Sequence, residues 1–204
     1  MKRILVVNLF LGPKRKLSFN KLVTRVKMLG AEVSISDHAG LSDLDPSQWA
    51  SYDGIILSGT EALFTRTADR KEFESLFAFL PKIETPALGI CGGHQALAIA
   101  YGGEVAKSAR HIDGFRTVEL EDKDHLLAGL PAKIRVMQSH YEEVKRLPPG
   151  FVRIARSKET KNEAMKHEEK SVYGVQFHPE RWNEENVAGK RILENFIEKI
   201  ATKA

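Results

Sequence analysis

Short apolar runs alternate with amphipathic stretches along this 204-residue chain, and this alternation limits its possible folds more than any other feature. The apolar runs predict buried strands at residues 4–8, 31–36, 54–57 and 86–90. Helices are expected between them at residues 18–29, 69–80 and 93–101, the first capped by Ser18 and ended by Gly30. This order is typical of an α/β fold with a mainly parallel central sheet flanked by helices.

The second half of the chain has a different pattern, with strands following one another closely. Strands are expected at residues 115–120, 134–138, 152–155 and 172–177, followed by a final helix at residues 184–200. The later strands predict a small antiparallel extension of the sheet. A chain of 204 residues fits a single domain, residues 1–204, which can bury a core without disulfides.

Composition and charge exclude several classes of function. The net charge is +4, but the basic residues are spread along the chain without interleaved aromatic residues, so no nucleic-acid partner is expected. No run of about 18 apolar residues occurs, so no membrane-spanning helix is expected. Cys91 is the one cysteine, and a chain without an internal disulfide suits the cytoplasm.

The segment ALGICGGHQ at residues 87–95 carries the most information about function. An apolar strand runs into Cys91, then Gly92 and Gly93, and then a helix. A strand–turn–helix junction of this kind presents its central side chain sharply, and small neighbours are needed because the backbone is crowded. The partial positive charge of a helix N-terminus favours a thiolate, and its backbone N–H groups can bind a developing oxyanion. The segment therefore predicts a nucleophilic cysteine.

A second segment, YGVQFHPE at residues 173–180, supplies a base and a group to orient it. Proline disfavours a helical conformation for the residue before it, which holds His178 extended. Residues two apart in an extended segment point the same way, so the Glu180 carboxylate is expected to reach the His178 ring. A histidine can take the thiol proton and return it to a leaving amine, while a carboxylate fixes its tautomer.

These two segments resemble the class I glutamine amidotransferases, whose motifs are G-[IV]-C-x-G-[HM]-Q and G-x-Q-[FW]-H-P-E. Within that family the chain resembles the glutaminase subunit or domain of GMP synthetase. The segment QSHYEEV at residues 138–144 resembles its S-H-x-[DE]-x-V, and EAMKH at residues 163–167 resembles its E-A-[MF]-x-H. The resemblance covers nearly the whole chain and implies the family's flavodoxin-like α/β fold.

The resemblance also implies a reaction and a set of site residues. The substrate would be L-glutamine, hydrolysed through a γ-glutamyl thioester on Cys91, and the ammonia would pass to a separate ATP-dependent synthetase, an ATP pyrophosphatase. Backbone N–H groups at Gly59-Thr60 and at Gly92 would form the oxyanion hole. The substrate-binding residues would be Gln95, Ser139, His140, Tyr141 and Glu142.

Two positions depart from the family pattern. The family usually has S-G-G-P where this chain has Ser58-Gly59-Thr60-Glu61, so Thr60 is expected to adopt a conformation in which glycine is usual. The residue after the nucleophile is usually leucine, and here Gly92 keeps the N–H donor but loosens the loop. Both departures point to an oxyanion hole that is inactive or controlled by a partner.

The histidines show no ligand spacing, so no metal site is expected. No cofactor is expected in this chain, and ATP and magnesium would be needed only by the synthetase partner. No ATP-binding motif occurs in the 204 residues. Two alternatives stay open at this point. One is a hydrolase of γ-glutamyl amides that acts without a partner, and the other is a non-catalytic regulatory relative.

Overall fold

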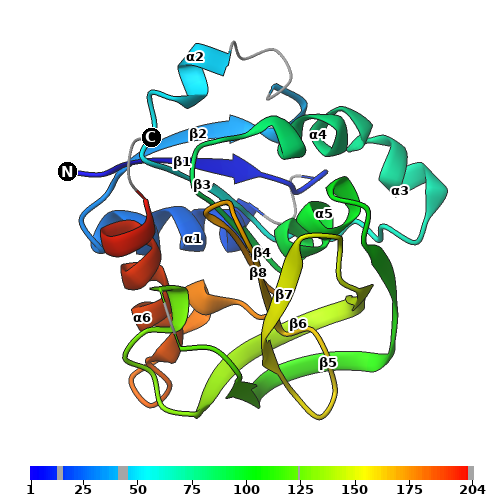
Figure 1. Cartoon of the computed structure of the whole chain (residues 1–204), viewed down its shortest axis with the longest axis vertical. Helices are drawn as coiled ribbons and strands as arrows, with labels where there is room; N and C mark the ends of the chain where they lie inside the picture. Colours follow the sequence, from blue (N-terminus) through cyan, green and yellow to red (C-terminus); the bar gives the residue numbers. More distant parts are fainter. Residues whose placement is uncertain (13–15, 41–45, 124, 202–204) are drawn as a thin grey trace.

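The computed structural model describes residues 1–12, 16–40, 46–123 and 125–201. Its strands are β1 (Arg3–Asn8), β2 (Glu32–Asp37), β3 (Gly54–Leu57), β4 (Ala87–Ile90), β5 (Glu104–Leu120), β6 (Lys133–Arg146), β7 (Phe151–Arg156), β8 (Ala164–His167) and β9 (Val172–Val175). They form one nine-stranded sheet in the order β2-β1-β3-β4-β9-β8-β7-β5-β6 (Figure 1).

Six α-helices accompany this sheet in the described part of the chain. They are α1 (Lys16–Met28), α2 (Pro46–Trp49), α3 (Thr67–Lys71), α4 (Glu74–Phe79), α5 (Gly92–Ala100) and α6 (Ala188–Asn195). Short 3₁₀ turns occur at His38–Gly40, Leu80–Lys82, His125–Leu127 and Pro179–Arg181, and a π-helix follows α6 at Phe196–Ile200.

The parallel half of the sheet has helices on both faces, and they cover the buried apolar residues of its inner strands β1, β3 and β4. In β1, Ile4 and Val6 pack in one hydrophobic cluster with side chains of α1 and α6. Leu5 and Val7 point to the opposite face and pack with side chains of α4 and α5. The sheet is therefore the middle layer between two sets of helices (Figure 1).

The strand order also determines where a ligand can bind. β1 lies between β2 and β3 and pairs with both in parallel, so the chain moves outward from β1 in two directions. In open α/β sheets, ligands bind at such a switch point, outside the carboxyl ends of the strands. The turns after β1, β3, β4 and β9 meet at this edge.

The prediction of a mainly parallel sheet with a small antiparallel extension was wrong in its proportions. β2, β1, β3, β4 and β9 pair in parallel, but β8, β7, β5 and β6 add four antiparallel strands. β5 and β6 have 17 and 14 residues and are much longer than expected. Buried and more exposed residues alternate along much of β6. A strand with charged residues on a solvated face has no continuous apolar run, so its full length is not evident from the sequence.

Three helices differ from the expectation, two at their first residue and one by a break in its middle. α1 begins at Lys16, so Ser18 lies in its first turn rather than at its cap. The helix expected at residues 69–80 is interrupted at Phe73, whose fully buried ring packs edge-on against Phe64. The last helix begins at Ala188 rather than at residue 184, because the Asn183 side chain accepts a hydrogen bond from the Asn186 backbone N–H and forms a turn.

Candidate active site

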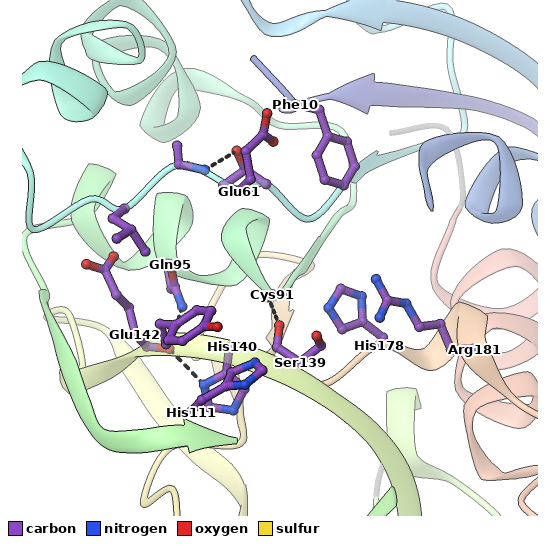
Figure 2. Close-up of a pocket in the computed structure, with 14 residues that line it drawn as sticks. Phe10, Glu61, Cys91, Gln95, His111, Ser139, His140, Glu142, His178 and Arg181 are labelled. Carbon is purple, nitrogen blue, oxygen red and sulfur yellow. Dashed lines mark hydrogen bonds between the residues drawn. The ribbon is translucent and has the colours of Figure 1, made fainter. Parts of the chain in front are cut away.

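A small pocket of about 180 Å³ opens at the switch-point edge of the sheet (Figure 2). Its walls come from segments far apart in the sequence, which the carboxyl ends of β1, β3, β4 and β9 bring together with the middle of β6. The lining residues are Phe10, Thr60, Glu61, Ala62, Leu63, Cys91, Gln95, His111, Ser139, His140, Tyr141, Glu142, His178 and Arg181. Every catalytic and substrate-binding position expected from the sequence, except Glu180, lies on this wall.

Cys91 occupies the junction between β4 and α5 with a strained backbone. Its φ of 51° and ψ of −102° are values that residues with a side chain rarely adopt. Such a conformation costs about 1–3 kcal/mol and persists only where the surrounding structure holds it. Here the Cys91 N–H donates to the Val175 carbonyl (2.8 Å), and the Gln95 N–H donates to the Cys91 carbonyl (3.1 Å). The strain directs the Cys91 side chain toward the pocket.

His178 and Glu180 form a buried pair beside Cys91. The distance between His178 Nδ1 and Glu180 Oε1 is 2.8 Å, and the two residues are only 5% and 4% exposed. The backbone N–H of His178 donates to the Met137 carbonyl, which ties His178 to β6. The expected extended segment was wrong in one detail, because Pro179–Arg181 is a 3₁₀ turn. The turn brings the Glu180 carboxylate back to the His178 ring.

The charges around His178 favour its protonated form. Burial alone would lower the pKa of this imidazole, but the carboxylate of Glu180 and a thiolate on Cys91 together raise it to about 9. Burial would raise the pKa of Glu180, yet the His178 imidazolium lowers it below its ordinary value. An imidazolium between a thiolate and a carboxylate suits a cysteine that attacks as a thiolate.

The positions expected to form the oxyanion hole lie beside Cys91. A Cβ atom on Gly59 would stand 3.2 Å from His178 Cε1 and 3.7 Å from Cys91 Cβ, so the Gly59 backbone packs closely against both residues. In the part of the chain that the structure describes, neither the Thr60 N–H nor the Gly92 N–H donates to another protein group. Both donors are available to a developing negative charge.

The expected strain at Thr60 was wrong. Among the described residues other than glycine, only Cys91 and His125 have a positive φ, so Thr60 needs no glycine-like conformation. The departure at Gly92 has a steric reason instead. A Cβ atom on Gly92 would lie 2.4 Å from Thr60 Cγ2 and 2.9 Å from the Thr60 nitrogen, which is too close for any side chain. Gly92 therefore makes room for Thr60, and the two departures from the family pattern are coupled.

The positions expected to bind substrate divide into two groups by the contacts they make. Gln95 Nε2 donates to the Glu142 carbonyl (2.8 Å), and His140 Nδ1 lies 2.9 Å from the same carbonyl. The Glu142 carboxylate accepts hydrogen bonds from the Phe64 and Thr65 N–H groups, so it holds the neighbouring loop instead of facing a ligand. Burial lowers the pKa of His140 to about 4, so its ring is neutral at physiological pH.

Ser139 and Tyr141 lie on the opposite face of β6 from His140. The Ser139 carbonyl lies 3.9 Å from Cys91 Sγ and accepts a hydrogen bond from the thiol. Tyr141 is 59% exposed, and its ring stacks on the His111 ring at 4.0 Å. These two rings lie at the edge of the pocket.

Several residues in or beside the pocket were not expected from the sequence. Phe10 and Glu61 extend the pocket beside β1 and β3, His111 comes from an irregular part of β5, and Arg181 lies 3.6 Å from the Glu180 carboxylate (Figure 2). Gln176 directly contacts Cys91 Sγ. Gln176 lies two residues before His178, and side chains two apart in an extended segment point the same way, so this contact could have been expected.

Glu163, from the segment EAMKH, is buried behind this site rather than in it. The Gln138 amide donates to both Glu163 carboxylate oxygens, at 2.9 and 2.8 Å. Burial raises the pKa of Glu163 from 4.5 to about 7. The folded state therefore binds this proton more tightly than the unfolded state.

The Glu163 contribution to stability should depend on pH with a definite sign. It is fully present below about pH 4.5 and is lost as the pH rises through about 7. The loss is on the order of 3 kcal/mol, since one pKa unit corresponds to about 1.4 kcal/mol. Between about pH 5 and about pH 8, the free energy of unfolding measured with urea should fall more in the wild type than in Glu163→Gln. Equal losses in the two proteins would contradict this assignment.

The described residues meet neither the requirements of a metal site nor those of a membrane-spanning helix. No group of three or more His, Cys, Asp or Glu side chains there could hold a metal ion. None of the helices in the described ranges is long and apolar enough to cross a membrane.

Comparison with known proteins matches this geometry to one family. The family model for class I glutamine amidotransferases matches residues 17–200. The glutamine-hydrolysing GMP synthase subunit of Pyrococcus furiosus is 39% identical over 171 residues, 84% of this chain and 87% of that protein. The corresponding GMP synthase subunit of Archaeoglobus fulgidus is 36% identical over 183 residues, 88% of this chain and 92% of that protein.

A solved structure gives the same result for the fold. It comes from Thermoplasma acidophilum, and its protein is assigned to the same GMP synthase subunit. It superposes with a TM-score of 0.81 at 27% sequence identity, covering 97% of this chain and 92% of that chain. Because the family model spans most of the sequence and the relatives align over most of both chains, this chain belongs to the class I glutamine amidotransferase family.

Proposed function

We propose that this chain hydrolyses L-glutamine through a thioester on Cys91 and supplies ammonia to the synthetase subunit of GMP synthase. One observation carries the proposal. Cys91 is held in a strained conformation at a helix N-terminus, against the buried His178–Glu180 pair. The relatives that are named as glutamine-hydrolysing match this chain over most of its length.

In the first half of the reaction, His178 takes the proton of Cys91 and the thiolate attacks the carboxamide carbon of glutamine. The carbonyl oxygen becomes an oxyanion, which the Thr60 and Gly92 N–H groups stabilise. The intermediate collapses when the carbon–nitrogen bond breaks. His178 donates its proton to the departing nitrogen, which leaves as ammonia, and a γ-glutamyl thioester remains on Cys91.

In the second half, His178 acts as a base toward water. Water attacks the thioester carbon while His178 takes one of its protons, and the same two N–H groups hold the oxyanion. The carbon–sulfur bond then breaks, glutamate leaves, and the Cys91 thiolate and His178 imidazolium are regenerated. Glu180 keeps one imidazole tautomer and stabilises the imidazolium throughout.

The partner we propose is a separate ATP pyrophosphatase that activates XMP with ATP and magnesium. The relatives are named as one subunit of GMP synthase, which implies a second subunit in those enzymes. The proposed division places all nucleotide chemistry in the partner, and this chain then needs no cofactor of its own. The cytoplasm is the compartment that we expect for this reaction.

The isolated chain should hydrolyse glutamine slowly, and the partner should activate it. Hydrolysis without an acceptor would waste glutamine, so a protein that donates ammonia gains from partner control. A tenfold activation needs only about 1.4 kcal/mol of transition-state stabilisation, which one well-placed hydrogen bond can supply. Ammonia release from glutamine should therefore rise at least about tenfold when the synthetase partner, ATP and XMP are added.

Two comparisons make this measurement decisive. The partner with ATP but without XMP should activate less, because the acceptor is missing. Full activity of the chain alone, unchanged by the loaded partner, would instead favour a hydrolase of γ-glutamyl amides that acts without a partner. No ammonia release under any of these conditions would favour a non-catalytic relative.

A further inference from the structure

Gln176 is a fully buried side chain that contacts the nucleophile. It follows β9 directly, and its backbone N–H donates to the Glu163 carbonyl (2.7 Å). Its side-chain Nε2 lies 3.8 Å from Cys91 Sγ, within the range of a hydrogen bond to sulfur. The proposed mechanism does not use this contact, and packing alone does not require an amide at this position.

The orientation of the Gln176 amide is determined by a chain of partners. The Glu142 carbonyl can only accept, so the Gln95 atom beside it at 2.8 Å must be the Nε2 donor. The same Gln95 nitrogen lies 3.2 Å from Gln176, so the Gln176 atom there must be the Oε1 acceptor. This leaves the Gln176 NH₂ group facing Cys91 Sγ.

The two protonation states of Cys91 then have different partners. The neutral thiol donates to the Ser139 carbonyl at 3.9 Å, and this carbonyl would repel a thiolate. The thiolate accepts from the Gln176 NH₂ group on another side of the sulfur. Gln176 thus offsets the effect of the Ser139 carbonyl in a site with little access to water.

We propose that Gln176 is a positioning residue that donates a hydrogen bond to the Cys91 thiolate, and that Gln95 sets the orientation of its amide. Gln95 and the Glu142 carbonyl belong to the wall of the pocket, so the contact links the pocket to the sulfur atom. The inference concerns the resting nucleophile, and it rests on the proposed function only in treating the thiolate as the attacking species.

Alkylation by iodoacetamide measures the thiolate directly and needs no glutamine turnover. Cys91 is the one cysteine of the chain, so the rate reports on a single sulfur atom. In Gln176→Met, which keeps the bulk but removes the donor, the pH of half-maximal alkylation should rise by about one unit, a tenfold loss of thiolate on the acid side. Gln176→Glu, which brings a carboxylate to the sulfur, should shift it further.

The other variants separate this role from packing. Gln95→Met should give a smaller shift because the Gln176 amide is then free to turn, and adding it to Gln176→Met should cause no further change. Gln138→Met is the matched control, since Gln138 is also a fully buried glutamine but bonds Glu163 instead of Cys91. It should leave the alkylation profile where it is in the wild type.

Thermal melts and circular dichroism identify any variant that fails to fold, and the glutamate and methionine variants test the same contact independently. Coincident alkylation profiles for wild type and a folded Gln176 variant would overturn the proposal, and so would an equal shift in Gln138→Met. Because the assay uses no glutamine, a wrong assignment of the glutaminase activity would appear in ammonia release and leave this result unaffected.

Discussion

Replacing Cys91 or His178 with alanine should lower kcat for glutamine hydrolysis by at least about 10⁴-fold. The nucleophile and the base act as a unit, so losing either costs about as much as losing both. Glu180→Gln should cost less, because the nucleophile and the base stay in place and only the orienting carboxylate is lost. Ammonia release in the presence of the loaded synthetase partner measures all three effects.

The double variant Cys91→Ala/His178→Ala is the control for this prediction. Its kcat should be within about tenfold of each single variant, since the two residues contribute to the same step. Loss of the fold would be seen in thermal melts. Alanine keeps the Cβ atom, so Cys91→Ala leaves the backbone strain at φ 51° as it is in the wild type. Activity near the wild-type level in His178→Ala would show that the base lies elsewhere.

Replacing Gly92 with leucine, the usual residue of the family, should lower kcat at least about 100-fold in this chain. The Cβ atom of residue 92 would meet Thr60 Cγ2 at 2.4 Å and the Thr60 nitrogen at 2.9 Å. The loop must then move, and it carries one of the two oxyanion donors. Loss of one such donor typically costs about 10²–10³ in kcat.

The double variant Thr60→Gly/Gly92→Leu tests the steric reason. Removing the Thr60 side chain removes the shorter of these two contacts and leaves the backbone N–H in place, so at least about tenfold of the lost activity should return. Recovery would show that positions 60 and 92 are coupled, as the structure indicates. A double variant no more active than Gly92→Leu would contradict the coupling.

The parallel half of the fold could be predicted because its strands carry their signal locally. Residues 54–57 and 87–90 are apolar throughout and buried on both faces, which gives continuous apolar runs in the sequence. The antiparallel half could not be predicted to its full extent. β5 includes exposed charged residues such as Lys107 and Arg110, and only pairing with β6 reveals them as parts of a strand.

The candidate site shows the same division between local and tertiary information. Cys91, His178 and Glu180 lie in two short segments whose residue types and spacing point to the chemistry, and the structure brings them together. The contact between Gly92 and Thr60 joins two segments that the sequence separates by about thirty residues, so its steric cause was not visible. The orientation of the Gln176 amide depends on Gln95 and Glu142, which only the packed structure places beside it.

A glutamine analogue with an electrophilic carbon at the position of the carboxamide tests the central claim most directly. Mass spectrometry after incubation should show one adduct per chain, located on the peptide that contains Cys91. L-glutamine should protect against the modification, and His178→Ala should slow it strongly because the base no longer helps to form the thiolate. Absence of any adduct, under conditions that fully label a known glutaminase, would contradict the assignment of Cys91 as the nucleophile.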